Sequence, residues 1–290
     1  MSRLALIPDK WAPSRHERQR AARRKRRDRR RAVVGALSTV AVLGVLGALV
    51  LTSAGWPRFA AQYLDFSYGA QVFPAVLSGL WLNLELVMFG APLILVLSLV
   101  LALLRTSRSP ALTPFRLIAV GYVDLFRSVP ILLVIYLVGF GVPTLELAGI
   151  PIDPAPLGLF AIVISYSGYV AEVIRAGIDS VHPSQRAAAR SLGLGNVATM
   201  RHVILPQALR RVRPALLNDF VSLIKDTSLI STIGPLDSVR NAQIEASSTF
   251  NFTPYMVSAL LFLIITVPLT RFTDYVAHRA LARQSAQGAT

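Results

Sequence analysis

Long stretches without a single charged side chain constrain the fold of this chain more than any other feature. Residues 32–57 carry no charge, and 32–52 are apolar enough to form one helix across a membrane. A helix of about 20 apolar residues crosses a hydrocarbon layer of about 30 Å. Five further apolar stretches lie at 86–104, 128–145, 154–171, 214–236 and 246–270. No ordinary soluble core accommodates so many, so the sequence predicts an all-α integral membrane protein with six spans.

Basic residues are concentrated at the N-terminus. The net charge is +15, and residues 1–31 alone hold 13 basic side chains against three acidic ones. In a soluble protein such an excess would favour nucleic-acid binding. Trp11 is the only aromatic residue in this segment, however, and no nucleic-acid-binding fold follows it. We therefore expect a disordered arm that orients the chain and is attracted to anionic lipid, at about 1 kcal/mol per basic residue near the surface.

The first apolar stretch could be a cleaved signal peptide or a retained anchor. Its apolar region is longer than the roughly 7–15 residues of an ordinary signal core. Thr52, Ser53 and Ala54 match a cleavage site only weakly. We expect a retained helix at 32–53, preceded by the basic tail.

The distribution of Lys and Arg between the loops predicts the orientation of the spans. Basic residues are in excess in cytoplasmic loops of membrane proteins. Six spans divide the loops into one group that is basic throughout, 1–31, 105–116, 179–214 and 275–290, and another that is neutral or acidic, 54–79, 142–156 and 235–253. The sequence thus predicts that both termini lie in the cytoplasm.

Several charged residues interrupt the apolar stretches. Asp124 with Arg127, and Glu172 with Arg175, are spaced three residues apart, so each pair can share a helix face and partly neutralise itself. These pairs lie near predicted span ends, where long side chains can reach the interface. The run 225–228 lies deeper in its span. There it indicates a solvated lumen or a specific network between helices.

The loop after the fourth span has the pattern of two helices joined by a glycine turn. Pro183 suits a helix start, and 187–189 are three alanines, which favour a helix. Gly193 or Gly195 can end that helix, and a second amphipathic helix, punctuated by Pro206, follows. We expect a compact helix–turn–helix knob beneath the membrane. An amphipathic hairpin lying on lipid is the alternative.

This loop resembles the EAA loop of ABC-importer permease subunits, with three alanines, Gly193 and the run 203–206 at matching positions. Other segments narrow the resemblance to permeases for polar and charged amino acids. These segments are 122–130, 169–178, 190–193, 203–208 and 223–229. The similarity covers roughly 77–279 and leaves out the basic tail and the first span. It departs from the family pattern in two places, because Ala187 replaces the acidic residue of the family and Ser184 replaces a glycine.

The resemblance implies a type I ABC importer transmembrane domain with five core helices plus one N-terminal helix. It implies a half-transporter in the bacterial cytoplasmic membrane that pairs with a second permease, the same or a related chain. An ATPase dimer that uses ATP and Mg, and an extracytoplasmic amino-acid-binding protein, are the further partners it implies. The ATPase-coupling residues that it implies are Gln185, Ala187, Ala188, Ala189, Gly193, Leu205 and Pro206. Because Ala187 carries no charge, an acidic contact with the ATPase is in doubt.

These patterns divide the chain into consecutive segments. We expect a basic cytoplasmic tail at 1–31, the N-terminal transmembrane helix at 32–53, an extracytoplasmic segment at 54–79, the permease domain at 80–279 with its EAA-like loop at 182–208, and a cytoplasmic C-terminal tail at 280–290.

An amino acid carries both charges, so its path needs polar side chains of both signs at span depth. Lys225 could meet the carboxylate, and Glu85, Asp219 or Asp226 the ammonium group. Candidate hydrogen-bonding residues on the path are Asn83, Ser165, Ser167, Thr227 and Ser228. A network of Lys225 and Asp226 that only fixes helix packing is an equally open interpretation.

Other function classes fit the sequence less well. The lysines are Lys10, Lys25 and Lys225, and none ends a glycine-rich phosphate loop, so ATP hydrolysis would fall to a partner. The four histidines have no metal-ligand spacing and the chain has no Cys, so we expect no metal site, no cofactor and no enzyme activity. A passive channel or membrane scaffold is the alternative, but neither needs a docking knob for an ATPase.

Overall fold

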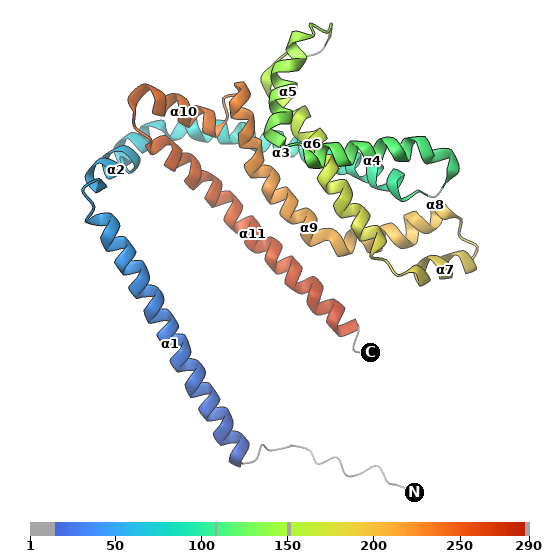
Figure 1. The fold of residues 1–290 in the computed structure, drawn as a ribbon, viewed down its shortest axis with the longest axis horizontal. Helices are drawn as coiled ribbons and strands as arrows, with labels where there is room; N and C mark the ends of the chain where they lie inside the picture. Colours follow the sequence, from blue (N-terminus) through green and yellow to red (C-terminus); the bar gives the residue numbers. More distant parts are fainter. Residues whose placement is uncertain (1–14, 108, 150–151, 288–290) are drawn as a thin grey trace. The chain divides into compact units, whose positions relative to one another are not determined.

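The computed structural model describes residues 15–107, 109–149 and 152–287, and every regular element within them is a helix (Figure 1). In chain order these are α1 (Arg15–Leu51), α2 (Trp56–Tyr63), α3 (Phe66–Thr106), η1 (Pro110–Leu112), α4 (Thr113–Ser128), α5 (Ile131–Thr144), α6 (Pro154–Asp179), α7 (Pro183–Ser191), α8 (Asn196–Thr199), the π-helical η2 (Met200–Ile204), α9 (Leu205–Asp226), the 3-10 helix η3 (Thr227–Ile233), α10 (Ser238–Thr249) and α11 (Thr253–Gln287). The helix is the open-chain structure that satisfies every backbone group in lipid.

Four helical segments are long and apolar enough to cross a membrane: Arg27–Leu51, Trp56–Thr106, Pro154–Asp179 and Thr253–Ala277. A fifth is gained if α4 and α5, which meet at an angle of 103°, form one broken span. They bend at Pro130, whose ring nitrogen has no hydrogen to continue the helix. The described part of the chain therefore has at most five such spans, against the six predicted.

The predicted span at 214–236 is the one that does not meet this criterion. The chain there forms the end of α9 and then η3, and it turns at Gly234, whose φ is 118°. Charged residues explain the difference, because the first half of α9 contains Arg210, Arg211 and Arg213 and its last turn contains Lys225 and Asp226. These side chains lower its mean hydropathy although its buried face packs in the bundle.

The chain forms two compact units, 1–60 and 61–290. In the first, α1 is a continuous helix of 37 residues that includes the basic segment from Arg15 onward. The expectation of a disordered arm is therefore wrong for 15–31, while residues 1–14 lie outside the described residues. The segment is rich in Arg, which is a good helix former, and it extends an apolar helix that is already formed.

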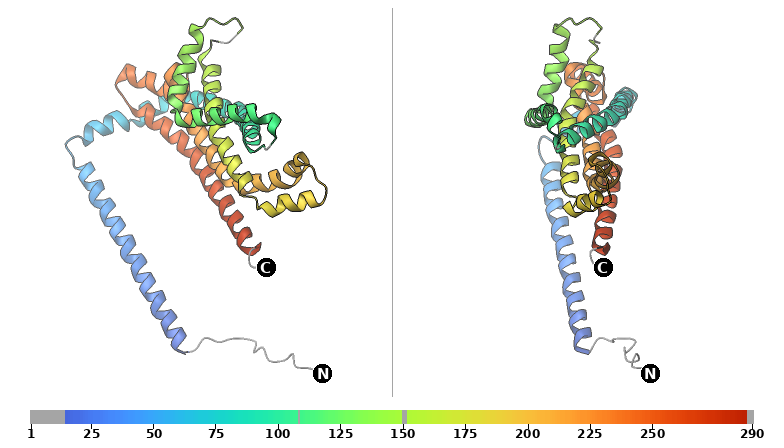
Figure 2. Two further views of the ribbon diagram at one scale, coloured as in Figure 1. Left: turned by 45° about the vertical axis from the view of Figure 1, so that its right-hand side comes forward. Right: turned by 90° about the vertical axis from the view of Figure 1, so that its right-hand side faces the viewer.

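In the second unit, α3 crosses the bundle in contact with α6, and α6 also packs against α4, α5 and α9 (Figure 2). The core contains fully buried Ile135, Ile162, Ile174 and Ile230. Glycines let the helices approach closely. A Cβ atom at Gly158, for example, would lie 2.8 Å from Cγ2 of Ile230.

Two helix boundaries differ from the expected ones. α3 begins at Phe66, about half of its length before the predicted span at 86–104, because the Asp65 carboxylate accepts the Tyr68 backbone N–H at 3.0 Å and caps the helix. The predicted span at 246–270 is interrupted at Phe250, which has a φ of 52°, so that α11 starts only at Thr253. α11 continues to Gln287, so the predicted tail at 280–290 is helical as far as it is described.

A close contact between α3 and the start of α10 predicts that Gly79→Ala destabilises the fold. A Cβ atom at Gly79 would lie 2.3 Å from the Asp237 carbonyl carbon and 2.5 Å from the Ser238 nitrogen. Because both are backbone atoms, we expect a loss of about 1–3 kcal/mol, as for other overpacked sites. The measurement is thermal unfolding of the detergent-purified chain.

Gly121→Ala is the matched control, since nothing lies within 4 Å of a Cβ atom at Gly121. We expect it to keep or slightly raise the unfolding temperature, because Ala is the better helix former. Equal unfolding temperatures for the two variants would contradict the contact.

Candidate functional site

The knob, residues 183–204, begins with the predicted helix and glycine turn. The His182 ring nitrogen Nδ1 accepts the Ser184 backbone N–H at 3.2 Å and caps α7. Gly193 has a φ of 79°, and its N–H donates to the Arg190 carbonyl at 2.9 Å. The predicted turn at Gly193 is confirmed, since a residue without Cβ takes this left-handed conformation at least cost.

The second half of the knob differs from the expectation. Pro206 does not interrupt the helix; α8, η2 and α9 follow one another without a break. Because Pro206 has no backbone N–H, the usual bond to the residue four positions earlier is missing there. The chain widens to a π-helical turn just before it, where the Leu205 N–H donates to the Met200 carbonyl.

The surface of the knob combines small and large apolar side chains. Ala187 and Ala188 are exposed, while Ala189 is buried against the second half of the knob. Leu192 and Val197, on either side of the glycine turn, are 82% and 81% exposed. Neighbouring large apolar side chains that face solvent indicate a surface for a protein or a membrane.

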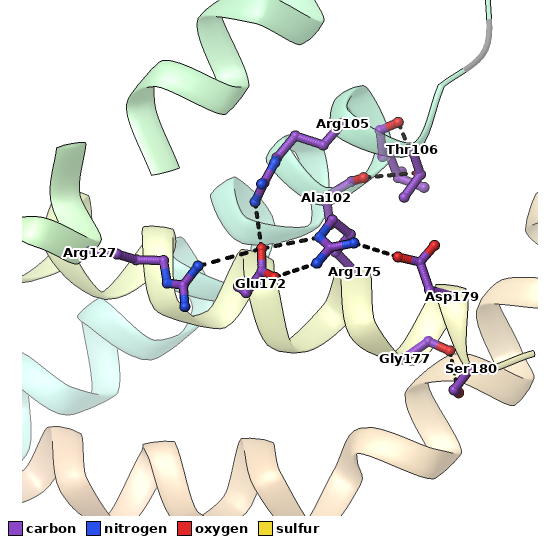
Figure 3. A network of polar contacts seen from close by, with 10 residues as sticks. Ala102, Arg105, Thr106, Arg127, Glu172, Arg175, Gly177, Asp179 and Ser180 are labelled. Atoms are coloured by element: carbon purple, nitrogen blue, oxygen red, sulfur yellow. Dashed lines mark hydrogen bonds and ion pairs between the residues drawn. The ribbon is translucent and has the colours of Figure 1, made fainter. Parts of the chain in front are cut away.

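An ion-pair hub joins α3, α4 and α6, and Glu172 is its centre (Figure 3). Its carboxylate is 2.6 Å from Arg105 Nη1, 2.5 Å from Arg175 Nη2 and 3.8 Å from Arg127 Nη1. Arg175 also pairs with Asp179 at 2.5 Å. The Arg105 and Glu172 side chains are only 13% and 22% exposed, so this pair is stronger than an ordinary surface pair.

The hub confirms one predicted pair and corrects the other. Glu172 and Arg175 pair as expected, but Asp124 and Arg127 form no salt bridge. Asp124 is exposed, and Arg127 turns instead toward Glu172. The spacing of Asp124 and Arg127 suits a pair on α4, but spacing within one helix cannot reveal that Glu172 on α6 competes for the same arginine.

Asn83, a predicted path residue, is fully buried and joins three elements. Its amide nitrogen donates to Thr227 Oγ1 at 3.2 Å and to Asp237 Oδ2 at 3.1 Å, while its oxygen accepts the Ser238 N–H at 3.2 Å. Ser238 Oγ lies 2.8 Å from Ser258 Oγ on α11. Asn83 and Thr227 therefore lie in a packing network.

Sequence reasoning missed Asp237, which is 0% exposed. Burial raises the pKa of its carboxyl to about 6, although hydrogen bonds from the Arg240 backbone and the Asn83 amide lower it. Asp237 caps α10 by accepting the Arg240 N–H at 2.8 Å. An acidic residue directly before a helix was the signal that could have identified it.

Further path residues, buried on α6 and partly buried on α9, are Ser165, Ser167, Asp219 and Asp226. The Tyr166 hydroxyl donates to Asp226 Oδ2 at 2.5 Å. Ser167 Oγ donates to the Ile164 carbonyl at 2.9 Å. Ser165 Oγ and Asp219 Oδ2 are buried and have no hydrogen-bond partner within the described part of the chain.

Lys225 and Ser228 line an open groove of about 220 Å³ beside α11. The other lining residues are Val239, Tyr255, Ser258, Ala259 and Phe262. Lys225 is exposed, and Glu85 is half-buried on α3 and not part of this lining. Two of the nine predicted path residues thus line this groove. No group of three or more His, Asp or Glu residues able to hold a metal ion occurs in the described ranges.

Comparisons with known proteins agree on one family. Residues 112–281 match the model of the binding-protein-dependent transport system inner membrane component. The probable amino-acid ABC transporter permease protein PatM of Vibrio harveyi is 35% identical over 71% of this chain and 92% of its own. The arginine transport system permease protein ArtQ of Bacillus subtilis is 33% identical over 71% of this chain and 93% of its own. A crystal structure of an amino acid ABC transporter with histidines superposes with a TM-score of 0.66 at 34% identity, over 74% of this chain and 98% of that one.

The ion-pair hub predicts that Glu172→Gln destabilises the second unit. The substitution leaves the Arg105 guanidinium without its carboxylate in a site that is mostly closed to water. Breaking a fully buried pair costs about 3–5 kcal/mol, and the remaining exposure here should reduce this to about 1–3 kcal/mol. Thermal unfolding in detergent measures the effect.

Asp179→Asn is the control for Glu172→Gln, because the Asp179 side chain is 53% exposed and, within the described residues, its one ion pair is with Arg175. Its loss should stay below about 1 kcal/mol. Similar losses for both variants would mean that Glu172 is not the centre of the hub.

Proposed function

The chain belongs to the family of binding-protein-dependent transport system inner membrane components, and we propose that it imports a polar or charged amino acid as the membrane-spanning permease subunit of an ATP-driven ABC importer. Family membership confirms the predicted fold class, a helical importer domain. Its homologues are permease subunits, that is, transporter components rather than enzymes. The names of PatM and ArtQ, an amino-acid and an arginine permease, support the substrate class.

The exposed knob is the observation that carries the coupling role. The sequence lacks a phosphate-binding loop, so the energy must enter through contact with another subunit. Leu192 and Val197 present two large apolar side chains to solvent next to the Gly193 turn. The family implies an ATPase and a substrate-binding protein as partners. A passive channel would have no use for this surface.

The arrangement of the partners follows from charge and from the family. The separate ATPase, which docks at the knob, uses ATP and Mg. This chain binds no cofactor of its own. A second permease, the same or a related chain, completes the pore. The knob is rich in arginine, as cytoplasmic loops are. That bias supports a bacterial cytoplasmic membrane location with both termini in the cytoplasm.

The groove at Lys225 is the proposed contact for the amino-acid carboxylate. Asp226 and Thr227 are already hydrogen-bonded to Tyr166 and Asn83, which favours a packing role for these two. Lys225 and Ser228 line the accessible groove beside them. Within the run 225–228, Asp226 and Thr227 therefore serve helix packing, and Lys225 and Ser228 serve transport.

Replacing Leu192 and Val197 by Ser tests the docking surface. Burying each side chain contributes roughly 1.5–3 kcal/mol to binding, so we expect the affinity for the ATPase to fall more than about tenfold. The measurement is retention of the ATPase on the affinity-purified permease.

Ile152→Ser is the control for this pair, because Ile152 is 70% exposed but lies in the loop before α6. It should retain the ATPase fully. If the knob variant retains as much ATPase as the Ile152 variant, the apolar tip is not the docking surface.

Lys225→Ala tests the groove. Uptake of radiolabelled amino acid into proteoliposomes should fall about tenfold or more, the scale of one charge-assisted hydrogen bond. Elution of the assembled complex in detergent should stay unchanged. Thr227→Ala should instead lower the unfolding temperature, because it removes a buried partner of Asn83. Wild-type uptake by the Lys225 variant would rule out a substrate contact.

A further inference from the structure

The chain leaves the bundle for the knob at the end of α6 and returns at the start of α9, and these two helix ends contact each other. α6 ends at Asp179 just before the knob, and α9 begins at Leu205 just after it. Gly177 lies at the crossing. A Cβ atom there would lie 2.6 Å from Val212 Cγ1 and 3.2 Å from the Ala208 carbonyl oxygen. α9 therefore packs against the α6 backbone so closely that Gly177 has no room for a side chain of its own.

A charged hydrogen bond closes the same crossing. Arg211 Nη1 on α9 donates to the Ser180 carbonyl, and it lies 3.3 Å from Ser180 Oγ. Ser180 is the C-cap of α6, and its hydroxyl donates to the Gly177 carbonyl at 2.7 Å. One guanidinium thus binds the end of α6, where backbone carbonyls have no partner within the helix.

The two helices are joined a second time at the far end of α9. Asp226 accepts the Tyr166 hydroxyl of α6 at 2.5 Å. The 15 residue steps from Arg211 to Asp226 correspond to about 22 Å of helix. Ile174 and Ile178, buried on α6, belong to the core that also contains Ala208 and Ile224 of α9. α6 and α9 are therefore fastened at both ends and packed between.

We infer that Arg211 and Gly177 form a clamp that makes α6 and α9 move as one unit when the knob moves. The clamp rests on the proposed function, because it transmits motion from a docked ATPase. Without it, a displacement of the knob would be taken up by the short connection at 180–182. With it, the displacement moves α6 and α9 together and reaches the groove at Lys225, on the last turn of α9. Arg211 is a positioning residue, since it touches neither substrate nor ATP.

Arg211→Ala in the complete importer tests the clamp. The complex with its ATPase and binding protein is reconstituted in proteoliposomes, and amino-acid uptake and ATP hydrolysis are measured together. We expect the ATPase to remain bound and to hydrolyse ATP, while uptake per ATP falls about tenfold, the scale of one hydrogen bond from a charged donor. Arg211→Lys, which keeps a donor, should restore part of this ratio.

Arg210→Ala is the matched control. Arg210 is the neighbouring residue on α9, is exposed, and its side chain makes no hydrogen bond or ion pair in the described part of the chain. Its ratio of uptake to ATP should equal that of the wild type. An unchanged ratio in Arg211→Ala would overturn the clamp alone. A wild-type chain that retains no ATPase would overturn the proposed function as well.

If Arg211→Ala does not assemble, a covalent crosslink in place of the hydrogen bond from Arg211 to Ser180 tests the clamp instead. The chain has no cysteine, so Ser180→Cys with Arg211→Cys gives one defined pair for a short reducible crosslinker. The clamp predicts that crosslinking raises uptake per ATP in this variant and that reduction reverses the gain. If crosslinking stops uptake and reduction restores it, the helices separate here during transport and the clamp is wrong.

Discussion

Every backbone N–H and C=O group within a bilayer must find a partner inside the protein, and the rest of the structure depends on this requirement. It explains why the long elements are helices and where the helices can stop. η3 interrupts the path of α9, yet Thr227, Ile230 and Ile233 within it are buried. Thr227 receives the Asn83 amide from α3. The irregular backbone is thus sheltered by protein rather than exposed to lipid.

Close approach between helices has to come from shape, because lipid tails are as apolar as the helix surfaces and no hydrophobic force draws helices together. Glycine supplies that shape at Gly79, Gly139, Gly158 and Gly177, where a Cβ atom would lie 2.8 Å or less from a neighbouring element. Gly177 combines this with its place beside the knob. Packing and coupling therefore meet at one residue, and a substitution there would affect both.

Local patterns predicted the parts of the structure that depend on neighbouring residues. The Gly193 turn, the Glu172–Arg175 pair and the apolar helices are of this kind. Contacts between distant residues could not be predicted, because nothing in the sequence near Asn83 indicates Asp237 as its partner. A span predicted from hydropathy ends at the first charged residue. The full length of α3 and the basic part of α1 were therefore not predicted as helix.

The π-helical turn at Met200–Ile204 has a consequence for the angular phase of α9. It holds one residue more than an α-turn, and each residue of an α-helix advances the direction of the side chains by about 100°. Restoring an ordinary turn by deleting one residue would rotate all of α9 about its axis relative to the Gly193 turn. Arg211 would then face away from Ser180. The extra residue therefore sets the rotation of α9 relative to the Gly193 turn. An insertion or deletion here would be tolerated far less than one in an exposed loop.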